Sequence, residues 1–140
     1  MKTDYPMDQL LKEIIGLAMK VHRTLGRGFK ESVYVNSLCL ELAAAKVPFE
    51  IEKPIPVFYN GHVVGDFATD LIVDGRLILD CKAIETLTTA DSVQLVNYLA
   101  ATRINDGLLL NFGAKSLQFK TKSREYDKTL GIPISLLQSR

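Results

Sequence analysis

The chain of 140 residues has little cysteine, little net charge and no long apolar run. Its two cysteines, Cys39 and Cys81, fall inside a predicted helix and a predicted strand, where they resemble small core residues more than a disulfide or a zinc-binding pair. No apolar run reaches the roughly 18–20 residues that cross a membrane, and the first residues lack the apolar centre of a signal peptide. We therefore expect a single cytoplasmic globular domain over residues 1–140, without membrane contact.

The net charge of +1 does not by itself predict binding to nucleic acid. Positive charge nevertheless gathers near the C-terminus, where five basic residues lie between Lys115 and Lys128, beside Glu125 and Asp127. Such a strip could contact phosphates, and the alternative interpretation is a solvated strand face.

Two helices are predicted in the first third of the chain. Apolar residues recur at helical spacing from about Asp8 to the glycine at position 26, which is a typical C-terminal stop. A second helix should run from Glu31 to about Lys46, with Glu31 in its first turn and one turn away from Tyr34. A glutamate in the first turn of a helix is also favourable to the helix dipole, so taken alone it is a structural feature.

A third helix is predicted from Thr88 to about Arg103. Thr88 followed by Asp91 resembles a capping box, which marks a helix start. Within this helix Gln94 and Tyr98 are four residues apart and therefore project from one face. The alternative for both is a helix face that forms hydrogen bonds to neighbouring loops.

The middle of the chain predicts antiparallel strands. From Glu50 the apolar pattern has a period of two, and Asn60-Gly61 and Asp74-Gly75 are typical hairpin turns, so we expect a three-strand meander. Two prolines in the first strand place it at a sheet edge. A buried strand at 107–112 and a further strand at 116–122 follow the third helix. The expected fold class is α/β (α+β), with a mixed central sheet and an antiparallel three-strand meander flanked by helices.

The second turn decides which side chains share a face. A two-residue loop would place the Asp70 side chain on the opposite face of the sheet from the side chains of Asp80 and Lys82. A three-residue loop over 73–75, with Gly75 left-handed, pairs Ile72 with Arg76 and separates polar from apolar residues. In this register one face carries Asp66, Asp70, Asp80 and Lys82, and the other carries Phe67, Leu71, Val73, Leu77, Leu79 and Cys81. Because this register buries the apolar set together, we favour it.

The acidic face predicts a metal site. Carboxylates at this density repel one another unless they share a cation, so a divalent metal is a natural occupant. A solvated hairpin edge is the alternative. His22 has no cysteine or second histidine at zinc spacing, so we expect it to be a packed, hydrogen-bonded helix residue. Asp66 is interpreted as a surface acid, although it shares the acidic face.

The order helix, meander, helix, strand, with Asp70 followed by Asp80-x-Lys82, resembles the PD-(D/E)xK nuclease core, the restriction-endonuclease-like fold. More specifically, the segment Gly28-Phe-Lys-Glu31-Ser-Val-Tyr34 is similar to the signature of the small bacterial GxxExxY proteins, which belong to that superfamily. The likeness runs from about Val21 to Lys122 and implies one nuclease-like domain with its core over these residues.

The resemblance implies roles for individual residues. Asp70 and Asp80 would hold Mg²⁺ or Mn²⁺, with the Cys81 backbone carbonyl as a third oxygen ligand and Glu31 bound directly or through water. Lys82 would position the attacking water and offset charge in the transition state.

Two further residues match a RecB-like pattern, and two positions depart from the superfamily pattern. Gln94 and Tyr98 match the Q-x-x-x-Y element of RecB-like members and would orient the metal-site residues or the DNA backbone. Asp80 stands where the family usually has glutamate, and Thr69 stands where the "PD" motif has proline. The shorter Asp80 side chain alters the reach of that ligand.

These observations predict a metal-dependent nuclease that hydrolyses phosphodiester bonds of DNA, with RNA as the less favoured substrate. The alternative is a catalytically weak or inactive nuclease-fold module that binds nucleic acid or a protein partner. A homodimer that places two sites on a duplex is a further option.

Overall fold

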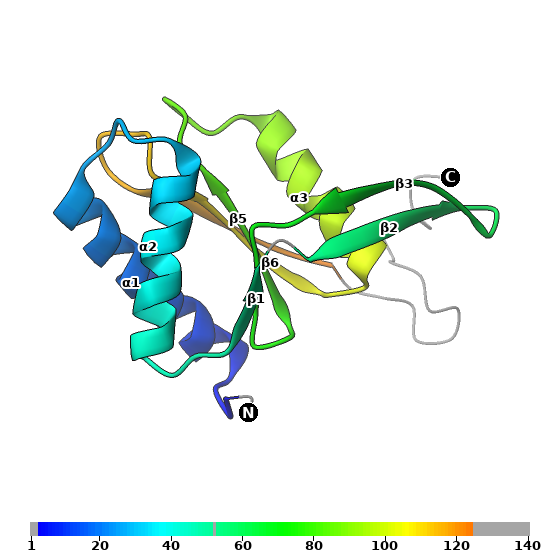
Figure 1. Cartoon of the computed structure of the whole chain (residues 1–140), viewed down its shortest axis with the longest axis horizontal. Coiled ribbons are helices and arrows are strands. Elements are labelled where there is room, and N and C mark those ends of the chain that lie inside the picture. Colours follow the sequence, from blue (N-terminus) through cyan, green and yellow to red (C-terminus); the bar gives the residue numbers. More distant parts are fainter. Residues whose placement is uncertain (1–2, 52, 125–140) are drawn as a thin grey trace.

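The computed structural model describes residues 3–51 and 53–124, and it contains a five-stranded mixed sheet between helices (Figure 1). The elements in chain order are α1 (Met7–Leu25), α2 (Glu31–Ala44), β1 (Phe49–Ile51), β2 (Pro54–Tyr59), β3 (His62–Ala68), β4 (Leu71–Val73), β5 (Leu77–Lys82), α3 (Thr89–Thr102), β6 (Asp106–Asn111) and β7 (Gln118–Ser123). The strand order in the main sheet is β1-β4-β5-β6-β7, and β5 and β6 are parallel while the other pairs are antiparallel. The predicted α/β class with a mixed central sheet is therefore confirmed.

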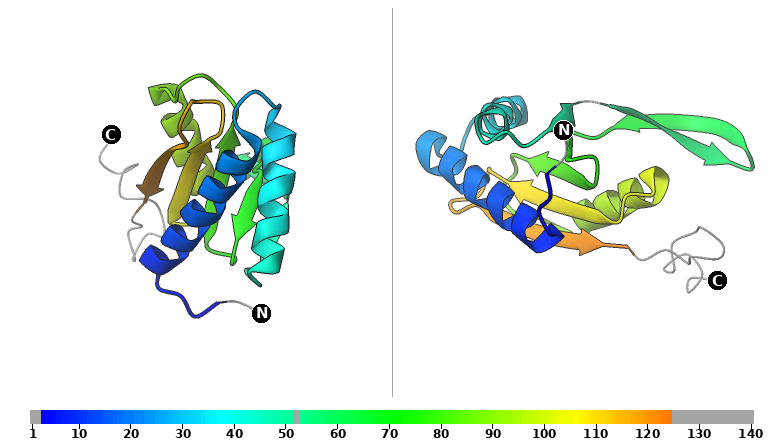
Figure 2. Two further views of the ribbon diagram at one scale, coloured as in Figure 1. Left: turned by 90° about the vertical axis from the view of Figure 1, so that its left-hand side faces the viewer. Right: turned by 90° about the horizontal axis from the view of Figure 1, so that it is seen from below.

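Helices cover both faces of the sheet, with α1 and α2 on one face and α3 on the other (Figure 2). Side chains alternate along β5, so Leu77, Leu79 and Cys81 pack towards α1 and α2. Ile78 packs instead with Leu95 and other residues beneath α3. Because β4, β5 and β6 are buried on both faces, they appear in the sequence as nearly continuous apolar runs.

The predicted meander is divided between two sheets. Strands β2 and β3 form a separate two-stranded ribbon, which projects from the body of the domain (Figure 1). The main sheet continues with β4, whose partner on the outer side is β1. Asp66 pairs with Pro56 in the ribbon and is exposed, so the prediction that it shares a sheet face with Asp80 is wrong. Phe67 packs with the α3 side of the core, contrary to its predicted grouping with Leu71.

The β4–β5 turn has three residues, as predicted, but it lies one position further along the chain. Val73 pairs with Leu77 and Ile72 with Ile78, so the loop is 74–76 and the predicted pair of Ile72 with Arg76 does not form. Asp74 and Gly75 have φ of 56° and 68°, and the Arg76 N–H donates to the Val73 carbonyl over 3.1 Å. Moving the three-residue loop by one position shifts the strand pairing by two residues. Because side chains alternate between faces with a period of two, the same side chains of β4 and β5 still share a face, as predicted.

Asp74 also anchors the N-terminal segment, a role that the sequence did not indicate. Its buried carboxylate accepts hydrogen bonds from the Thr3 N–H and hydroxyl, each over 2.7 Å, and from Arg76 Nε over 2.8 Å. Burial alone would raise the pKa of Asp74, but the hydrogen bonds from Thr3 and Arg76 overcome this effect and the pKa is lowered. The turn between β4 and β5 is therefore tied to the start of the chain.

Several smaller predictions can be compared with the structure. His22 is buried and its Nε2 lies 3.0 Å from the Ala114 carbonyl, which confirms a packed, hydrogen-bonded histidine. Cys39 and Cys81 are both free thiols. Arg124 is buried and donates to the Val96 carbonyl over 2.8 Å, so it is not part of an exposed basic strip. Lys115 and Lys120 are exposed and Lys122 is half-buried, while Lys128 lies outside the described residues. Among the described helices, none is long and apolar enough to cross a membrane.

Candidate active site

Asp70 lies immediately before the short strand β4. The β4–β5 register, continued by one residue, places Asp70 opposite Asp80. Beyond the end of the ladder, Asp70 Oδ2 accepts a hydrogen bond from the Cys81 N–H over 2.8 Å. The carboxylate thus takes the place of a backbone acceptor of β4 and extends the pairing of β5.

The Cys81 carbonyl faces the same side as Asp70. The Lys82 carbonyl accepts a hydrogen bond from the Phe112 N–H over 2.9 Å, so the Lys82 peptide groups face β6. Successive residues of a strand direct their N–H and C=O groups to opposite neighbours. The Cys81 N–H and C=O therefore face away from β6, towards Asp70, where the carbonyl oxygen can serve as a ligand.

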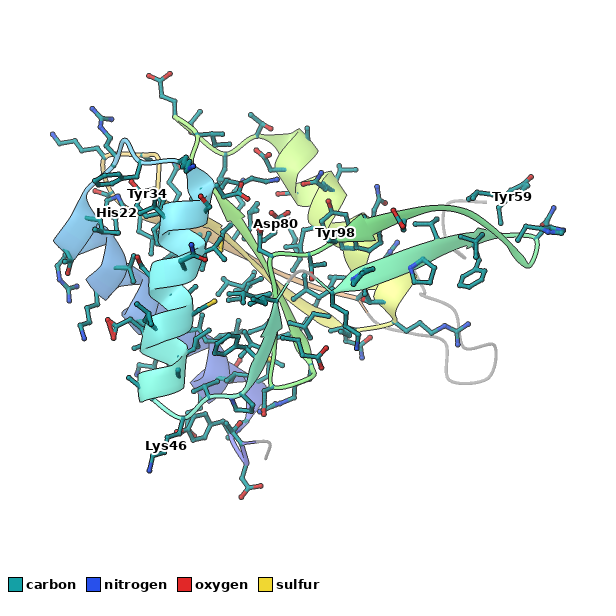
Figure 3. All side chains as sticks on the ribbon, in the orientation of Figure 1. His22, Tyr34, Lys46, Tyr59, Asp80 and Tyr98 are labelled. Atoms are coloured by element: carbon teal, nitrogen blue, oxygen red, sulfur yellow. The ribbon has the colours of Figure 1, made fainter. Side chains whose placement is uncertain are left out.

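Asp80 lies in the middle of the molecule, between α2 and α3, within the buried run of β5 (Figure 3). The residue is 4% exposed. Its Oδ1 lies 3.3 Å from Lys82 Nζ, whereas its Oδ2 is buried and has no hydrogen-bond partner within residues 3–51 and 53–124. Burial raises the pKa of Asp80 to about 6, while the Lys82 ammonium lowers it and the Asp70 carboxylate adds to the increase. An unsatisfied buried carboxylate oxygen is costly, and it indicates a missing partner.

Glu31 reaches the same region from the first turn of α2. Its side chain shares a hydrogen bond with that of Asp70, and burial together with the Asp70 charge raises the pKa of Glu31 to about 7. The charges of Lys82 and Asp80 also act on Glu31. The structure therefore places Glu31 of α2 beside Asp70 and within electrostatic range of Asp80 on β5.

The loop before α2 explains why Glu31 is placed here. Gly28 has a φ of 115°, a conformation that side-chain-bearing residues rarely adopt. The Tyr34 hydroxyl donates to the Gly26 carbonyl over 2.6 Å and accepts from the Phe29 N–H over 3.2 Å. Tyr34 is fully buried and its ring stacks on Phe112. The spacing of glycine, glutamate and tyrosine thus fixes the loop and orients the first turn of α2.

Lys82 bridges the carboxylates and α3. Its Nζ donates to Gln94 Oε1 over 2.7 Å and contacts Asp80. Burial alone would lower the pKa of Lys82, but the Asp80 and Glu31 carboxylates raise it, so the ammonium stays protonated at neutral pH. Gln94 therefore holds the lysine from the side opposite β5.

Tyr98 lies one turn after Gln94, where α3 meets the ribbon (Figure 3). Its ring stacks on Phe67 with the centroids 4.2 Å apart and an interplanar angle of 7°. Burial and then the Asp80 charge raise the pKa of Tyr98. Tyr98 is thus in the electrostatic range of the site, while its ring packs against β3.

The donor set fits a hard divalent cation. Among the described residues no three His, Cys, Asp or Glu side chains converge at metal-binding distance. The unpaired Asp80 Oδ2, the Asp70 carboxylate and the Cys81 carbonyl nevertheless offer three oxygens, and oxygen ligands with water suit Mg²⁺ and Mn²⁺. Glu31 lies beside Asp70.

Sequence reasoning did not place two other polar residues beside the site. Asn111 is fully buried, and its Oδ1 accepts from the Ile84 and Gly113 N–H groups, each over 3.0 Å, which holds the loop after β5. A polar residue at the end of an apolar strand was the available indication. Asp91 accepts from the Thr88 N–H over 2.8 Å, and its charge also acts on Asp80 and Lys82.

Comparisons with known proteins agree with the fold. A family model described as "PD-(D/E)XK nuclease superfamily" matches residues 8–124. A solved protein described as "Crystal structure of SSO0001" is 14% identical and superposes with a TM-score of 0.51 over 77% of this chain, which shows likeness of fold. This chain matches about half of that protein's length, 55%. A comparison with curated proteins finds no significant match.

Proposed function

Because the chain belongs to the PD-(D/E)XK nuclease superfamily, we propose that it is a metal-dependent nuclease that hydrolyses phosphodiester bonds of DNA, with RNA as the less favoured substrate. The observation that carries the proposal is the buried Asp80 Oδ2, which has no hydrogen-bond partner in the described part of the chain and lies in the same site as a protonated lysine and two further carboxyl groups. We further propose that the chain is a cytoplasmic member of the GxxExxY group, on the basis of Gly28, Glu31 and Tyr34.

Asp70, Asp80 and the Cys81 carbonyl would hold Mg²⁺ or Mn²⁺, with Glu31 as an additional carboxylate through water. When bound, such a cation acidifies the attacking water and polarises the phosphate. Its positive charge would also supply the missing partner for Asp80 Oδ2.

Lys82 and its neighbours would act directly on the substrate. The Lys82 ammonium, held between Asp80 Oδ1 and Gln94 Oε1, has donors left to orient a water molecule or to contact a phosphate oxygen. Because it remains protonated, it offsets the negative charge that develops in the transition state. Gln94 would position Lys82, and Tyr98 would contact the backbone of the nucleic acid.

The test compares wild type with Lys82→Ala on single- and double-stranded DNA, in Mg²⁺, Mn²⁺ and EDTA. We expect cleavage that needs the metal and that falls about 100-fold or more in the variant, as for loss of one preorganised charge. Lys20→Ala is a matched control, because Lys20 is an exposed lysine of α1 whose ion pair is with Glu41 of α2. Equal cleavage by wild type and Lys82→Ala would indicate a contaminating nuclease and refute the proposal.

A second candidate is a catalytically weak or inactive module that binds nucleic acid or a protein partner. The short Asp80 side chain, 4% exposed at the usual place of a glutamate, favours this alternative. Tight binding of nucleic acid, with no metal binding by calorimetry and no cleavage, would support it. Light scattering with and without DNA would test whether the protein acts as a homodimer.

A further inference from the structure

A groove lies next to the candidate active site, between the β2–β3 ribbon and α3. Its volume is about 620 Å³, within the range of about 300–1,000 Å³ that proteins use for organic ligands. Phe58 and Phe67 of the ribbon form one side, and Asn97, Tyr98 and Arg103 form the other. Tyr98 lines the groove and lies one turn of α3 after Gln94, which accepts a hydrogen bond from Lys82, so the groove adjoins the site.

The groove combines aromatic walls with a few polar groups. Phe58 is 62% exposed, which is unusual for a large apolar side chain, and the stacked pair of Phe67 and Tyr98 forms the part nearest the site. The side chains of Asn97 and Arg103 are exposed at its α3 side. An aromatic surface, one amide and one guanidinium match the groups that bind an unpaired base by stacking, by its edge and by its phosphate.

The ribbon is poorly suited to accept another strand. Pro54 and Pro56 remove two N–H groups from β2. The pairing shifts between Val57 and Phe58 of β2, which leaves Val64 of β3 as an extra, bulged residue. Prolines and bulges are the devices that prevent sheet edges from pairing. The exposed Phe58 is therefore suited to a ligand that contacts its ring, and a nucleic-acid base fits the chemistry of that ring better than a partner strand does.

We propose that this groove binds unpaired nucleotides of the substrate, so that the preferred DNA is single-stranded or carries a single-stranded segment next to the scissile phosphate. This inference rests on the proposed nuclease function. Its specific content is that a base stacks against Phe58 while the adjoining phosphate enters the site past Tyr98. The small net charge of the chain is consistent with recognition that relies on stacking more than on a broad basic surface.

The experiment measures binding without cleavage. In EDTA, oligonucleotides that contain 2-aminopurine are titrated with wild type, Phe58→Ala and Tyr59→Ala, as single strands and as blunt duplexes. We expect wild type to prefer the single strand and Phe58→Ala to bind it about 10-fold more weakly, as for loss of one stacked base. Tyr59 is the matched control, because it is the next residue of the ribbon and is 68% exposed but does not line the groove. Circular dichroism and thermal unfolding verify that both variants are folded.

The outcomes separate this inference from the proposed function. Unchanged single-strand affinity in Phe58→Ala, or equal losses in both variants, would overturn the groove assignment even if wild type cleaves DNA. The expected binding pattern without metal-dependent cleavage would instead support the groove and contradict the nuclease proposal. Sedimentation tests a further outcome. If wild type is a dimer that dissociates in Phe58→Ala, and the oligonucleotide affinity is unchanged, the groove is occupied by a second copy of the chain and the proposal is wrong.

Discussion

Replacing Asp80 with asparagine should stabilise the metal-free protein. Asparagine has nearly the shape of aspartate, so the substitution removes the buried charge and leaves the packing of β5 unchanged. The pKa of Asp80 rises from 3.8 to about 6 on folding, and at about 1.4 kcal/mol per pKa unit this is a penalty of about 3 kcal/mol for the ionised form. This value includes the attraction of Lys82, which acts in the opposite direction.

The sign of the pH dependence follows from linkage. Because the folded state binds the Asp80 proton more tightly, this group favours folding most below pH 3.8, and its contribution is lost as the pH rises towards about 6. At pH 8 the whole penalty is present in wild type and absent in Asp80→Asn. We therefore expect the variant to be more stable than wild type by about 1–3 kcal/mol in EDTA at pH 8, and the difference to shrink at pH 4.

Metal should reverse this order. A cation that binds only the folded state at 100 times its Kd adds about 2.7 kcal/mol to the free energy of unfolding of wild type. Asp80→Asn lacks a charged ligand and should gain much less. The assay is urea unfolding followed by circular dichroism, with EDTA or with Mg²⁺ or Mn²⁺. A variant that is less stable than wild type in EDTA at pH 8, or that gains as much from metal, would refute the reasoning.

Three further substitutions test the scaffold. Asp74→Asn should lower the free energy of unfolding by about 3 kcal/mol at pH 7, measured by urea titration. Because the folded state lowers the pKa of Asp74, this loss should become smaller as the pH falls through the acid range. A loss of stability that does not change with pH would contradict this. Gly113→Ala should cost about 3 kcal/mol or more in the same assay, because a Cβ there would overlap the Ile84 backbone; an unchanged midpoint would show that the loop can move. Tyr34→Phe should cost about 1–2 kcal/mol in thermal unfolding, because the Gly26 carbonyl loses its donor, whereas Tyr59→Phe at an exposed hydroxyl should cost nothing, and equal losses would count against the assigned bond.

Local signals in the sequence were sufficient to predict where the helices begin and end. Gly26 ends α1, and the Thr88 N–H does donate to the Asp91 carboxylate at the start of α3. The division of faces in β4 and β5 was also predictable, because the two strands are joined by a tight turn and burial permits only one parity for their apolar residues.

The division of the predicted meander between two sheets was not predictable from these signals. The chain passes from β3 to β4 through Thr69 and Asp70, and the extended pattern continues without a glycine or proline there. The pairing that separates the sheets is that of β1 with β4, which joins residues about 20 positions apart and leaves no local mark. Asp66 was therefore grouped with the acidic face although it belongs to the ribbon.

The position of Glu31 illustrates the same limit. An acidic residue in the first turn of a helix is ordinary, and its approach to Asp70 depends on a loop fixed by the Tyr34 hydroxyl and on the packing of α2 over β5. Neither contact has a periodic pattern, so only resemblance to a known family could indicate this residue.

Asp80 is the opposite case, because its sequence context already conflicts with its chemistry. It interrupts the buried run of β5 and pairs with Leu109 on β6, so no shift of register that preserves the core could bring it to the surface. A charge in such a place is a local inconsistency that persists where function requires it. The structure adds what the sequence could not contain: one oxygen of Asp80 meets Lys82, while the other has no partner among the described residues. That unmatched oxygen is what favours a bound cation over a purely structural ion pair, since an ion pair alone would leave half of the carboxylate unsatisfied.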